Sequence, residues 1–156
     1  MMAAFSIRPA AQTDRAAILG LAVRLGAFDP TTRTAAEIAS REARALADAL
    51  THPPVGSALL VAENGQPGLA GVLFLETRKD YFTGDPHGHV AILAVAKHAE
   101  GQGLGRALLR AAEEWGRTKG FSRLTLSVFA DNHRAREFYA RDGWRAELET
   151  YYKPLQ

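Results

Sequence analysis

The feature that most constrains the fold is an apolar strand that runs into three closely spaced glycines and then into a helix. Residues 89–96 are almost wholly apolar, which predicts a strand buried on both faces. Gly101-Gln102-Gly103-Leu104-Gly105 follows, and residues 104–119 carry apolar side chains at helical spacing. Glycines let the backbone approach a ligand closely, and the free amides at a helix start attract anions. The arrangement therefore predicts a phosphate-binding turn.

The remaining sequence alternates between strand-like and helix-like segments. Thr34 followed by Glu37 is a capping box, and Asp131 or Asn132 is expected to cap a later helix. Strands are expected at 5–8, 57–62, 69–77, 89–96, 123–129, 144–148 and 150–155, and helices near Thr13, Thr34, Leu104 and Asn132. Because we find no repeat, low-complexity tract or linker, we expect one α/β (α+β) domain over residues 1–156.

Composition excludes several classes of function. The formal net charge of +2 is too small to indicate a nucleic-acid surface. With no cysteine, disulfides and thiolate catalysis are impossible, and we expect no metal site because the histidines lack ligand spacing. The first eight residues do not resemble a signal peptide, and no apolar run is long enough to span a bilayer. We therefore expect a cytoplasmic protein without membrane association.

Three interpretations of the glycine segment compete. A P-loop needs Gly-Lys-Ser/Thr, whereas this chain has Gly105-Arg106-Ala107. A dinucleotide-binding fingerprint needs its third glycine one residue later, where Arg106 stands, and it belongs near the first strand of the fold. A glycine-rich turn without a ligand is as plausible as a binding site on the glycines alone.

A second motif supports ligand binding. It is Asn132-His133-Arg134-Ala135-Arg136-Glu137-Phe138-Tyr139, followed by Gly143-Trp144. Together with Ile92-Leu93-Ala94-Val95 and the glycine segment, it resembles the GNAT superfamily of N-acetyltransferases. The resemblance covers nearly the whole chain. It implies a mixed, mostly antiparallel sheet of about six to seven strands flanked by about four helices.

The resemblance also implies acetyl-CoA as the acetyl donor and assigns the residues that bind it. Main-chain groups of Leu93, Ala94 and Val95 would pair with the pantetheine arm, and Asn132 would hold the cofactor from the next helix. The pyrophosphate would lie on the segment whose residues are Gly101, Gln102, Gly103, Leu104, Gly105 and Arg106. The family usually has Arg or Gln where this chain has Glu100, so we expect Glu100 to turn to solvent.

Tyr139 and His89 are the candidate catalytic residues. By family position, Tyr139 would protonate the leaving thiolate; alternatively, it is a core tyrosine beside Phe138. His89 stands where histone-acetylating relatives carry a glutamate base, and histidine titrates near neutrality. Strand alternation predicts that His89 shares a face with Leu93 and Val95. A partly exposed histidine at a strand start is equally plausible, and Ser127 stands where other relatives carry their base.

The acceptor side of the site is less well defined by the sequence. Glu76 on a neighbouring strand and Tyr81 in the following loop are candidate substrate-binding residues, although solvent exposure or local packing explains them equally well. His87 is interpreted as ordinary loop polarity. Glu147 and Glu149 are interpreted either as a charge for a cationic amine or as exposed strand residues.

The resulting hypothesis is an N-acetyltransferase that moves the acetyl group from acetyl-CoA to a primary amine. Without a cysteine for an acyl-enzyme, direct transfer in a ternary complex is expected. The acceptor is a small-molecule amine or a peptide amine, and a homodimer is possible because the family often dimerises. The alternatives are a non-catalytic acyl-CoA-binding sensor or regulatory module and a transferase for a longer acyl group.

Overall fold

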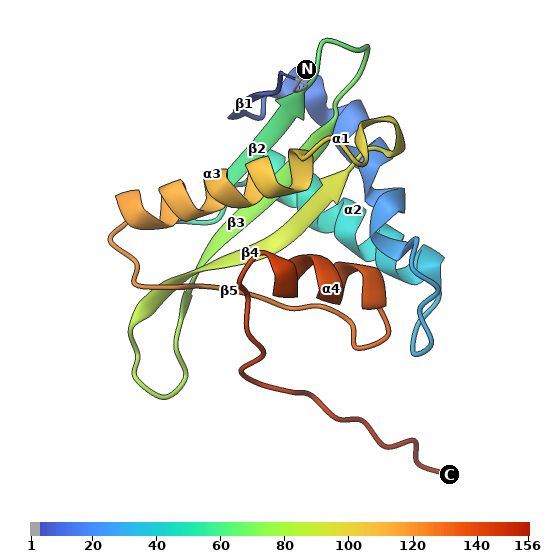
Figure 1. Ribbon diagram of the computed structural model, residues 1–156, viewed down its shortest axis with the longest axis vertical. Helices are drawn as coiled ribbons and strands as arrows, with labels where there is room; N and C mark the ends of the chain where they lie inside the picture. The colour runs from blue at the N-terminus through green and yellow to red at the C-terminus, as the bar shows by residue number, and fades with distance from the viewer. Residues whose placement is uncertain (1–3) are drawn as a thin grey trace.

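The computed structural model describes residues 4–156, so the first three residues of the stretch considered for a signal peptide lie outside it. One sheet of five strands, in the order β1-β2-β3-β4-β5, forms the centre (Figure 1). Neighbouring strands are antiparallel except β4 and β5, which are parallel. The strands are β1 Ser6–Pro9, β2 Ala58–Glu63, β3 Gly71–Lys79, β4 Pro86–Val95 and β5 Leu124–Leu126.

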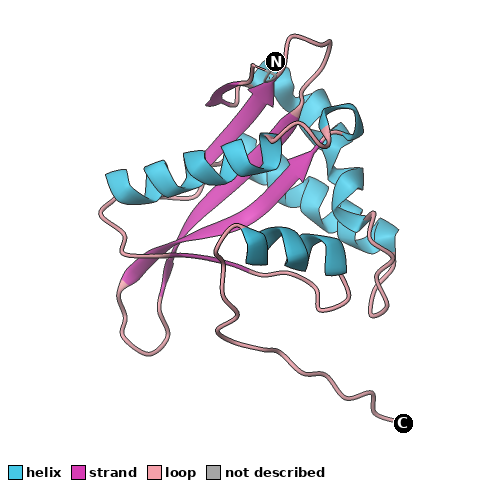
Figure 2. Ribbon diagram, in the orientation of Figure 1, coloured by secondary structure: helices cyan, strands magenta, loops and turns pink. Residues whose placement is uncertain are grey.

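Helices cover both faces of this sheet. They are α1 Arg15–Leu21, α2 Ala35–Thr51, α3 Leu104–Thr118 and α4 His133–Arg141, with short 3-10 turns at Gln12–Asp14, Ala22–Gly26 and Lys97–Ala99. Figure 2 shows α3 and α4 in front of the sheet and α1 and α2 behind it. The capping box is confirmed at the start of α2, where the Thr34 hydroxyl accepts from the Glu37 amide and the Glu37 carboxylate accepts from the Thr34 amide.

The core lies where these helices cross β3 and β4. Leu73 and Leu75 are fully buried in the sheet, and Leu104 and Leu108 of α3 pack over Gly71. Gly88 is the point of closest approach: a Cβ atom there would lie 2.5 Å from a Leu124 methyl carbon and 2.8 Å from the Trp115 ring. Only glycine therefore allows β4, β5 and α3 to meet at this point.

A β-bulge bends β4 halfway along its length. Phe74 of β3 pairs with Ile92, but the next residue, Leu75, pairs with Val90, so Ala91 is the extra residue. Pairing between β4 and β5 ends at the same place, with Val90 and Leu126 as the last partners. Beyond this point the two strands part and leave an opening, which we call the splay.

The bulge also corrects one prediction. Simple alternation placed His89 on the same face as Leu93 and Val95, but the extra residue reverses the order. His89 pairs with Glu76 of β3, whereas Leu93 pairs with Leu73 on the opposite face. His89 therefore lies on the face of the sheet that does not carry α3.

The resemblance implied about six to seven strands, and the sheet has fewer. No strand forms at 144–148 or 150–155, and the strand expected at 123–129 is reduced to residues 124–126. The carboxyl-terminal segment instead extends away from the body of the protein (Figure 1).

Candidate active site

The glycine segment forms the floor of the site at the start of α3. Gly101 and Gly103 have φ angles of 73° and 83°, the left-handed region that favours glycine. No atom lies within 4 Å of a Cβ built at either position, so the space above them is open. The first helical bond runs from the Ala107 amide to the Gly103 carbonyl, and no side chain caps the helix. The amides of the first turn are thus available to an anion.

Gly105 serves a different purpose from the other two glycines. It lies within α3, and a Cβ atom there would approach the Phe138 ring to 3.1 Å. Phe138 belongs to α4, so the third glycine allows α4 to pack closely against the start of α3. The apparent Gly-x-Gly-x-Gly motif therefore combines two turn glycines with one packing glycine.

The edge of β4 forms one wall of the splay. The Ala96 amide donates to Ala70 on the β3 side, at 2.8 Å. Because backbone groups alternate along an extended strand, the amides and carbonyls of Val95 and Leu93 point the other way, towards the splay. The main chain of Ala94 instead faces β3. Of the three residues predicted to pair with a pantetheine arm, Leu93 and Val95 have the suitable orientation.

A group of three charged residues lies beside the glycine segment. The Arg24 guanidinium donates to the Val95 carbonyl at 3.3 Å and forms an ion pair with Glu100. Arg134, in the first turn of α4, lies 3.7 Å from the same carboxylate. The expectation that Glu100 turns to solvent is therefore wrong: its side chain is 30% exposed and holds two arginines at the rim of the splay.

Arg106 and Arg110 both interact with Asp142, which lies just after α4. The side chain of Asp142 is almost completely buried, and its carboxylate lies 2.6 Å from Arg110 and 3.6 Å from Arg106. The Trp144 indole donates to the second carboxylate oxygen at 3.2 Å. This network joins α3 to the end of α4.

Asn132 and Tyr139 lie at the two ends of α4. The Asn132 carbonyl oxygen accepts from the Ala135 amide at 3.3 Å, which confirms Asn132 as the helix cap. Tyr139 is half-buried, between the rings of Phe138 and Trp144. Burial raises the pKa of Tyr139, so its phenol keeps its proton at neutral pH.

His89 lies at the closed end of the splay and contacts β5. Its Nδ1 atom is 2.8 Å from the Thr125 hydroxyl, and only 6% of the residue is exposed. Burial, with a smaller effect from the Arg78 charge, lowers the pKa of His89 to about 4. The imidazole is therefore neutral at pH 7. If Nδ1–H donates to Thr125, Nε2 carries the free lone pair.

A carboxylate lies beside His89 on the same face of the sheet. Glu76 is its partner on β3 and accepts a hydrogen bond from Arg78 at 2.9 Å. Burial raises the pKa of Glu42, on α2, and the charge of Glu76 contributes to this increase. Glu76 is thus the carboxylate beside the histidine, and Arg78 pairs with it.

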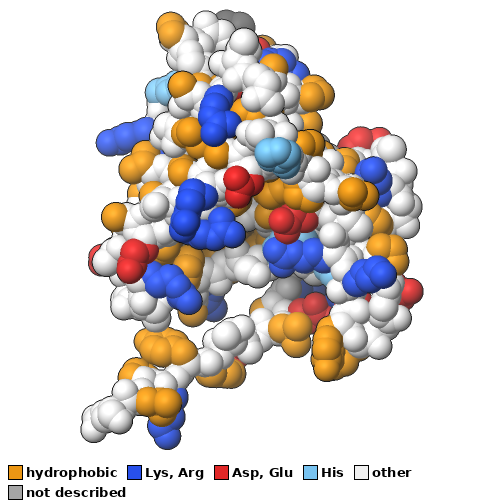
Figure 3. All heavy atoms as spheres, turned by 180° about the vertical axis from the view of Figure 1, so that it is seen from behind, with side chains coloured by type: hydrophobic (Ala, Val, Ile, Leu, Met, Phe, Trp, Pro, Cys, Tyr) orange, Lys and Arg blue, Asp and Glu red, His pale blue; other side chains and the backbone are white. Residues whose placement is uncertain are grey.

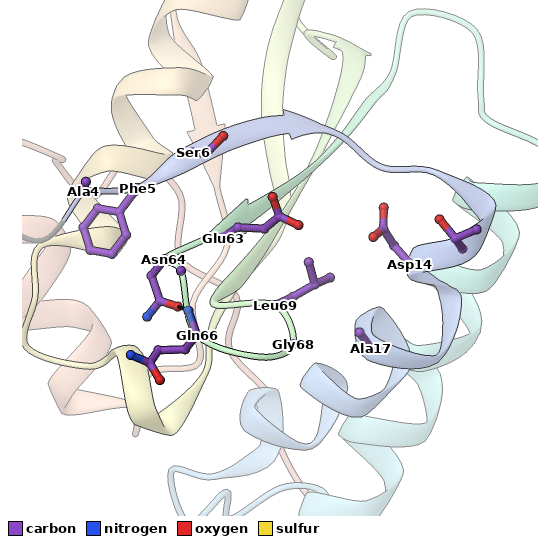
Figure 4. A pocket seen from close by; sticks show the side chains of 12 residues that line it. Ala4, Phe5, Ser6, Asp14, Ala17, Glu63, Asn64, Gln66, Gly68 and Leu69 are labelled. Atoms are coloured by element: carbon purple, nitrogen blue, oxygen red, sulfur yellow. Dashed lines mark hydrogen bonds between the residues drawn. The ribbon is translucent and has the colours of Figure 1, made fainter.

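Three other features complete the description of the site region. Tyr81 is 92% exposed in the loop between β3 and β4 and contacts Phe82, so the structure does not bring it to His89. His87, expected in that loop, instead lies buried within β4, and its Nδ1 atom has no partner in the described residues. A hollow of about 660 Å³ lies near β1 (Figure 4), but its Asp14 and Glu63 carboxylates are paired with Arg8.

Within residues 4–156, no helix is both long and apolar enough to cross a membrane. In the same residues, no three or more His, Asp or Glu side chains come together as ligands for a metal ion.

The splay, the glycine loop and the capped α4 define a GNAT-type acetyltransferase. The model of the acetyltransferase (GNAT) family matches residues 27–144, so the chain belongs to this family. Among curated proteins, no sequence matches this chain.

Solved structures show the same fold. A putative acetyl transferase from Pyrococcus furiosus is 25% identical, with a TM-score of 0.77, and the match covers 97% of this chain and 100% of that chain. An aminoglycoside antibiotic 6'-N-acetyltransferase from Acinetobacter haemolyticus is 18% identical, with a TM-score of 0.70 and coverage of 97% and 98%. Another, from Acinetobacter baumannii, is 16% identical, with a TM-score of 0.73 and coverage of 98% and 99%.

The sequence alone did not identify several residues of the site. Arg24 lies 71 positions from Val95, and Asp142 lies 32 positions from Arg110. Thr125 is in hydrogen-bonding range of His89 only because β4 and β5 run parallel in that register. No local pattern predicts such contacts, since each depends on packing between distant elements.

Proposed function

We propose that this acetyltransferase binds acetyl-CoA in the splay and transfers the acetyl group directly to a primary amine. The observation that carries the proposal is the end of β4–β5 pairing at Val90, next to the bulge at Ala91. It leaves main-chain groups of Leu93 and Val95 facing an opening that leads to the glycine loop. We further propose that residues 1–156 act as one domain.

The residues around the glycine segment fit the phosphates of coenzyme A. Free amides of the first turn of α3, together with the helix dipole, favour a pyrophosphate group. Arg24 and Arg134 lie at the rim and supply positive charge, while Glu100 holds them in place. Asn132 lies at the start of α4, near this rim. Only its side-chain carbonyl oxygen is used in the helix cap, so its side-chain NH2 group remains to donate to the cofactor.

The proposed chemistry needs three groups of this chain. Bound acetyl-CoA supplies a thioester whose acetyl carbon is attacked by an amine. The Val95 amide is oriented to donate to an oxygen that gains charge. Nε2 of His89 accepts a proton from the amine, directly or through water, and the neutral Tyr139 phenol returns a proton to the sulfur. His89 gains one proton and Tyr139 loses one, so the protein returns to its starting state when His89 releases its proton to solvent and the Tyr139 phenolate takes one up.

The acceptor is proposed to be a cationic small molecule or a peptide amine. Glu76, the partner of His89 on β3, is the proposed contact for the ammonium group, in competition with Arg78, which pairs with it. Two of the structural neighbours are aminoglycoside N-acetyltransferases, which is consistent with an amine acceptor but does not identify it. A cytoplasmic location, where acetyl-CoA is available, is part of this proposal.

A non-catalytic acyl-CoA-binding module is the second candidate. The observation that favours it is the low pKa of His89, about 4, because such a histidine is a weak base at neutral pH. In this case the splay binds the acyl-CoA, but no amine is acetylated.

Two measurements separate these candidates. Calorimetric titration with coenzyme A tests binding, and release of free thiol from acetyl-CoA across a panel of amines tests transfer. The enzyme proposal expects both; binding without thiol release in the presence of any amine supports the module.

Tyr139→Phe is expected to lower kcat by about 10²-fold or more with little change in KM. An unchanged rate would exclude Tyr139 as the acid.

Gly103→Glu tests the cofactor site itself. The new carboxylate lies over the free amides of α3 and should abolish coenzyme A binding. Gly120→Glu is the matched control, because Gly120 also has a left-handed φ, 78°, and open space, but lies at the far end of α3. Both variants carry the same backbone strain and charge change, so retained binding in Gly103→Glu would contradict the proposed site.

A further inference from the structure

Arg24 occupies a main-chain group that the proposed cofactor site needs. It belongs to the 3-10 turn Ala22–Gly26, which packs against β4. Its Nε–H group donates to the Val95 carbonyl at 3.3 Å. This carbonyl faces the splay, where β5 no longer pairs with β4, and it is one of the groups proposed to pair with a pantetheine arm. The guanidinium therefore takes the position that an amide group of the ligand would take.

A carboxylate holds Arg24 in this position. Nη2 of the same guanidinium forms an ion pair with Glu100, the residue that precedes the glycine loop. The Arg24 and Glu100 side chains are 27% and 30% exposed, so both lie at the rim of the splay. One guanidinium thus links the edge of β4 to the beginning of the glycine loop. A ligand that extends along both has to displace it or bind it.

The two parts of coenzyme A differ in what they offer this arginine. A pantetheine amide that pairs with the Val95 carbonyl first breaks the hydrogen bond from Arg24 and offers no charge in return. A phosphate group on the glycine loop offers an anionic, bidentate partner instead. Arg134, 3.7 Å from Glu100, keeps that carboxylate paired when Arg24 leaves it. The contact therefore lowers the affinity for a neutral ligand more than the affinity for an anionic one.

We propose that Arg24 is a specificity-determining residue, which admits phosphate-bearing acyl carriers and disfavours neutral pantetheine derivatives. In the free protein Arg24 covers the Val95 carbonyl. When coenzyme A binds, Arg24 turns to the pyrophosphate and frees this carbonyl for the pantetheine arm. The inference rests on the proposed binding of coenzyme A in the splay. It adds that the two parts of the ligand bind cooperatively, because both act on one side chain.

The surface charge of the protein as a whole does not account for such selection. The formal net charge is only +2. Figure 3 shows the side of the molecule that lies behind the sheet in Figure 1, and basic and acidic side chains are interspersed on it. A protein without a dominant positive field attracts anions only weakly at long range. Selection for phosphate groups therefore depends on individual side chains such as Arg24.

Selectivity is measured as the ratio of the dissociation constants of pantetheine and coenzyme A, both obtained by NMR titration, in which the spectra also show that each variant is folded. Arg24→Met removes the charge and the donor but keeps the length of the side chain. It is combined with Glu100→Gln, because a carboxylate left without Arg24 would itself repel the phosphates. Relative to Glu100→Gln alone, pantetheine should bind about threefold more tightly and coenzyme A about threefold more weakly, so the ratio falls about tenfold. In the same background Arg24→Lys, a milder change, should lose less affinity for coenzyme A.

Arg15→Met in the same background is the matched control. Arg15 is an exposed residue at the start of α1 and binds Thr51, so its loss should leave the ratio unchanged. Dephospho-coenzyme A keeps the pyrophosphate and should lose as much affinity as coenzyme A does; if it loses none, Arg24 does not bind the pyrophosphate and the proposal is overturned. An unchanged ratio in a protein that binds coenzyme A overturns this inference alone. A wild-type chain that does not bind coenzyme A overturns the proposed function with it.

Discussion

Replacing His89 tests how strongly the fold holds this imidazole in its neutral form. Burial lowers its pKa from 6.5 to about 4. Between these pH values the unfolded chain binds a proton that the folded protein does not, so acidification favours unfolding. Each pH unit in this window costs the folded state about 1.4 kcal/mol, which amounts to about 3 kcal/mol over the whole window. This stability is fully present above pH 6.5 and is lost as the pH falls towards 4.

His89→Gln removes the titrating group but keeps a side chain that can contact Thr125. The free energy of unfolding is measured by urea denaturation, followed by the fluorescence of Trp115 and Trp144. On going from about pH 7 to about pH 5, the wild-type protein should lose about 2 kcal/mol more than the variant. The buried carboxylate of Asp14 does not interfere, because its pKa is lowered to about 2 and its contribution is lost only below 3.8.

His98→Gln is the control for this experiment. His98 is exposed beside the glycine loop, so this variant should follow the pH dependence of the wild-type protein. The reasoning is refuted if His89→Gln loses as much stability on acidification as the wild-type protein does. That result would mean that folding does not keep His89 neutral.

Three further predictions concern single residues. Thr34→Ala removes the cap of α2 and should lower the free energy of unfolding by about 1 kcal/mol, measured by thermal denaturation; an unchanged stability would contradict this role. Gly88→Ala should cost about 1–3 kcal/mol in the same assay because its Cβ meets Leu124, whereas Gly20→Ala, with open space, should not destabilise. Glu100→Gln should tighten coenzyme A binding by up to about fivefold in calorimetry, because Arg24 is released towards the phosphates; Glu114→Gln, on an exposed part of α3, should leave it unchanged.

The sequence predicted the elements that carry strong local signals. The capping pair of Thr34 and Glu37, the cap at Asn132 and the apolar stripe of α3 all depend on residues a few positions apart, and each is confirmed. The glycine segment was correctly placed between β4 and α3 for the same reason. The family assignment is also confirmed, because its two motifs are local.

Predictions that depended on regularity or on distant contacts were wrong. The side of the sheet that carries His89 was missed because a bulge at Ala91 leaves no clear mark in an apolar strand. Glu100 was expected in solvent because its partner, Arg24, lies 76 positions away. The two closing strands were predicted from residues 144–148 and 150–155, but neither segment forms a strand in the described part of the chain. The roles of Tyr139, His89 and the binding residues stay predictions.

The short parallel pairing between β4 and β5 affects which parts of the protein unfold locally at the lowest free energy. β2 to β4 form an antiparallel meander, whereas β5 joins it through three residue pairs that lie 36 positions apart in the sequence. Non-local contacts of this kind form late in folding. A strand that is held by few of them unfolds locally at a low free-energy cost. Hydrogen exchange should therefore be faster in β5 than in β2 to β4. A ligand held between β4 and α4 would close this seam and slow exchange on both sides of it.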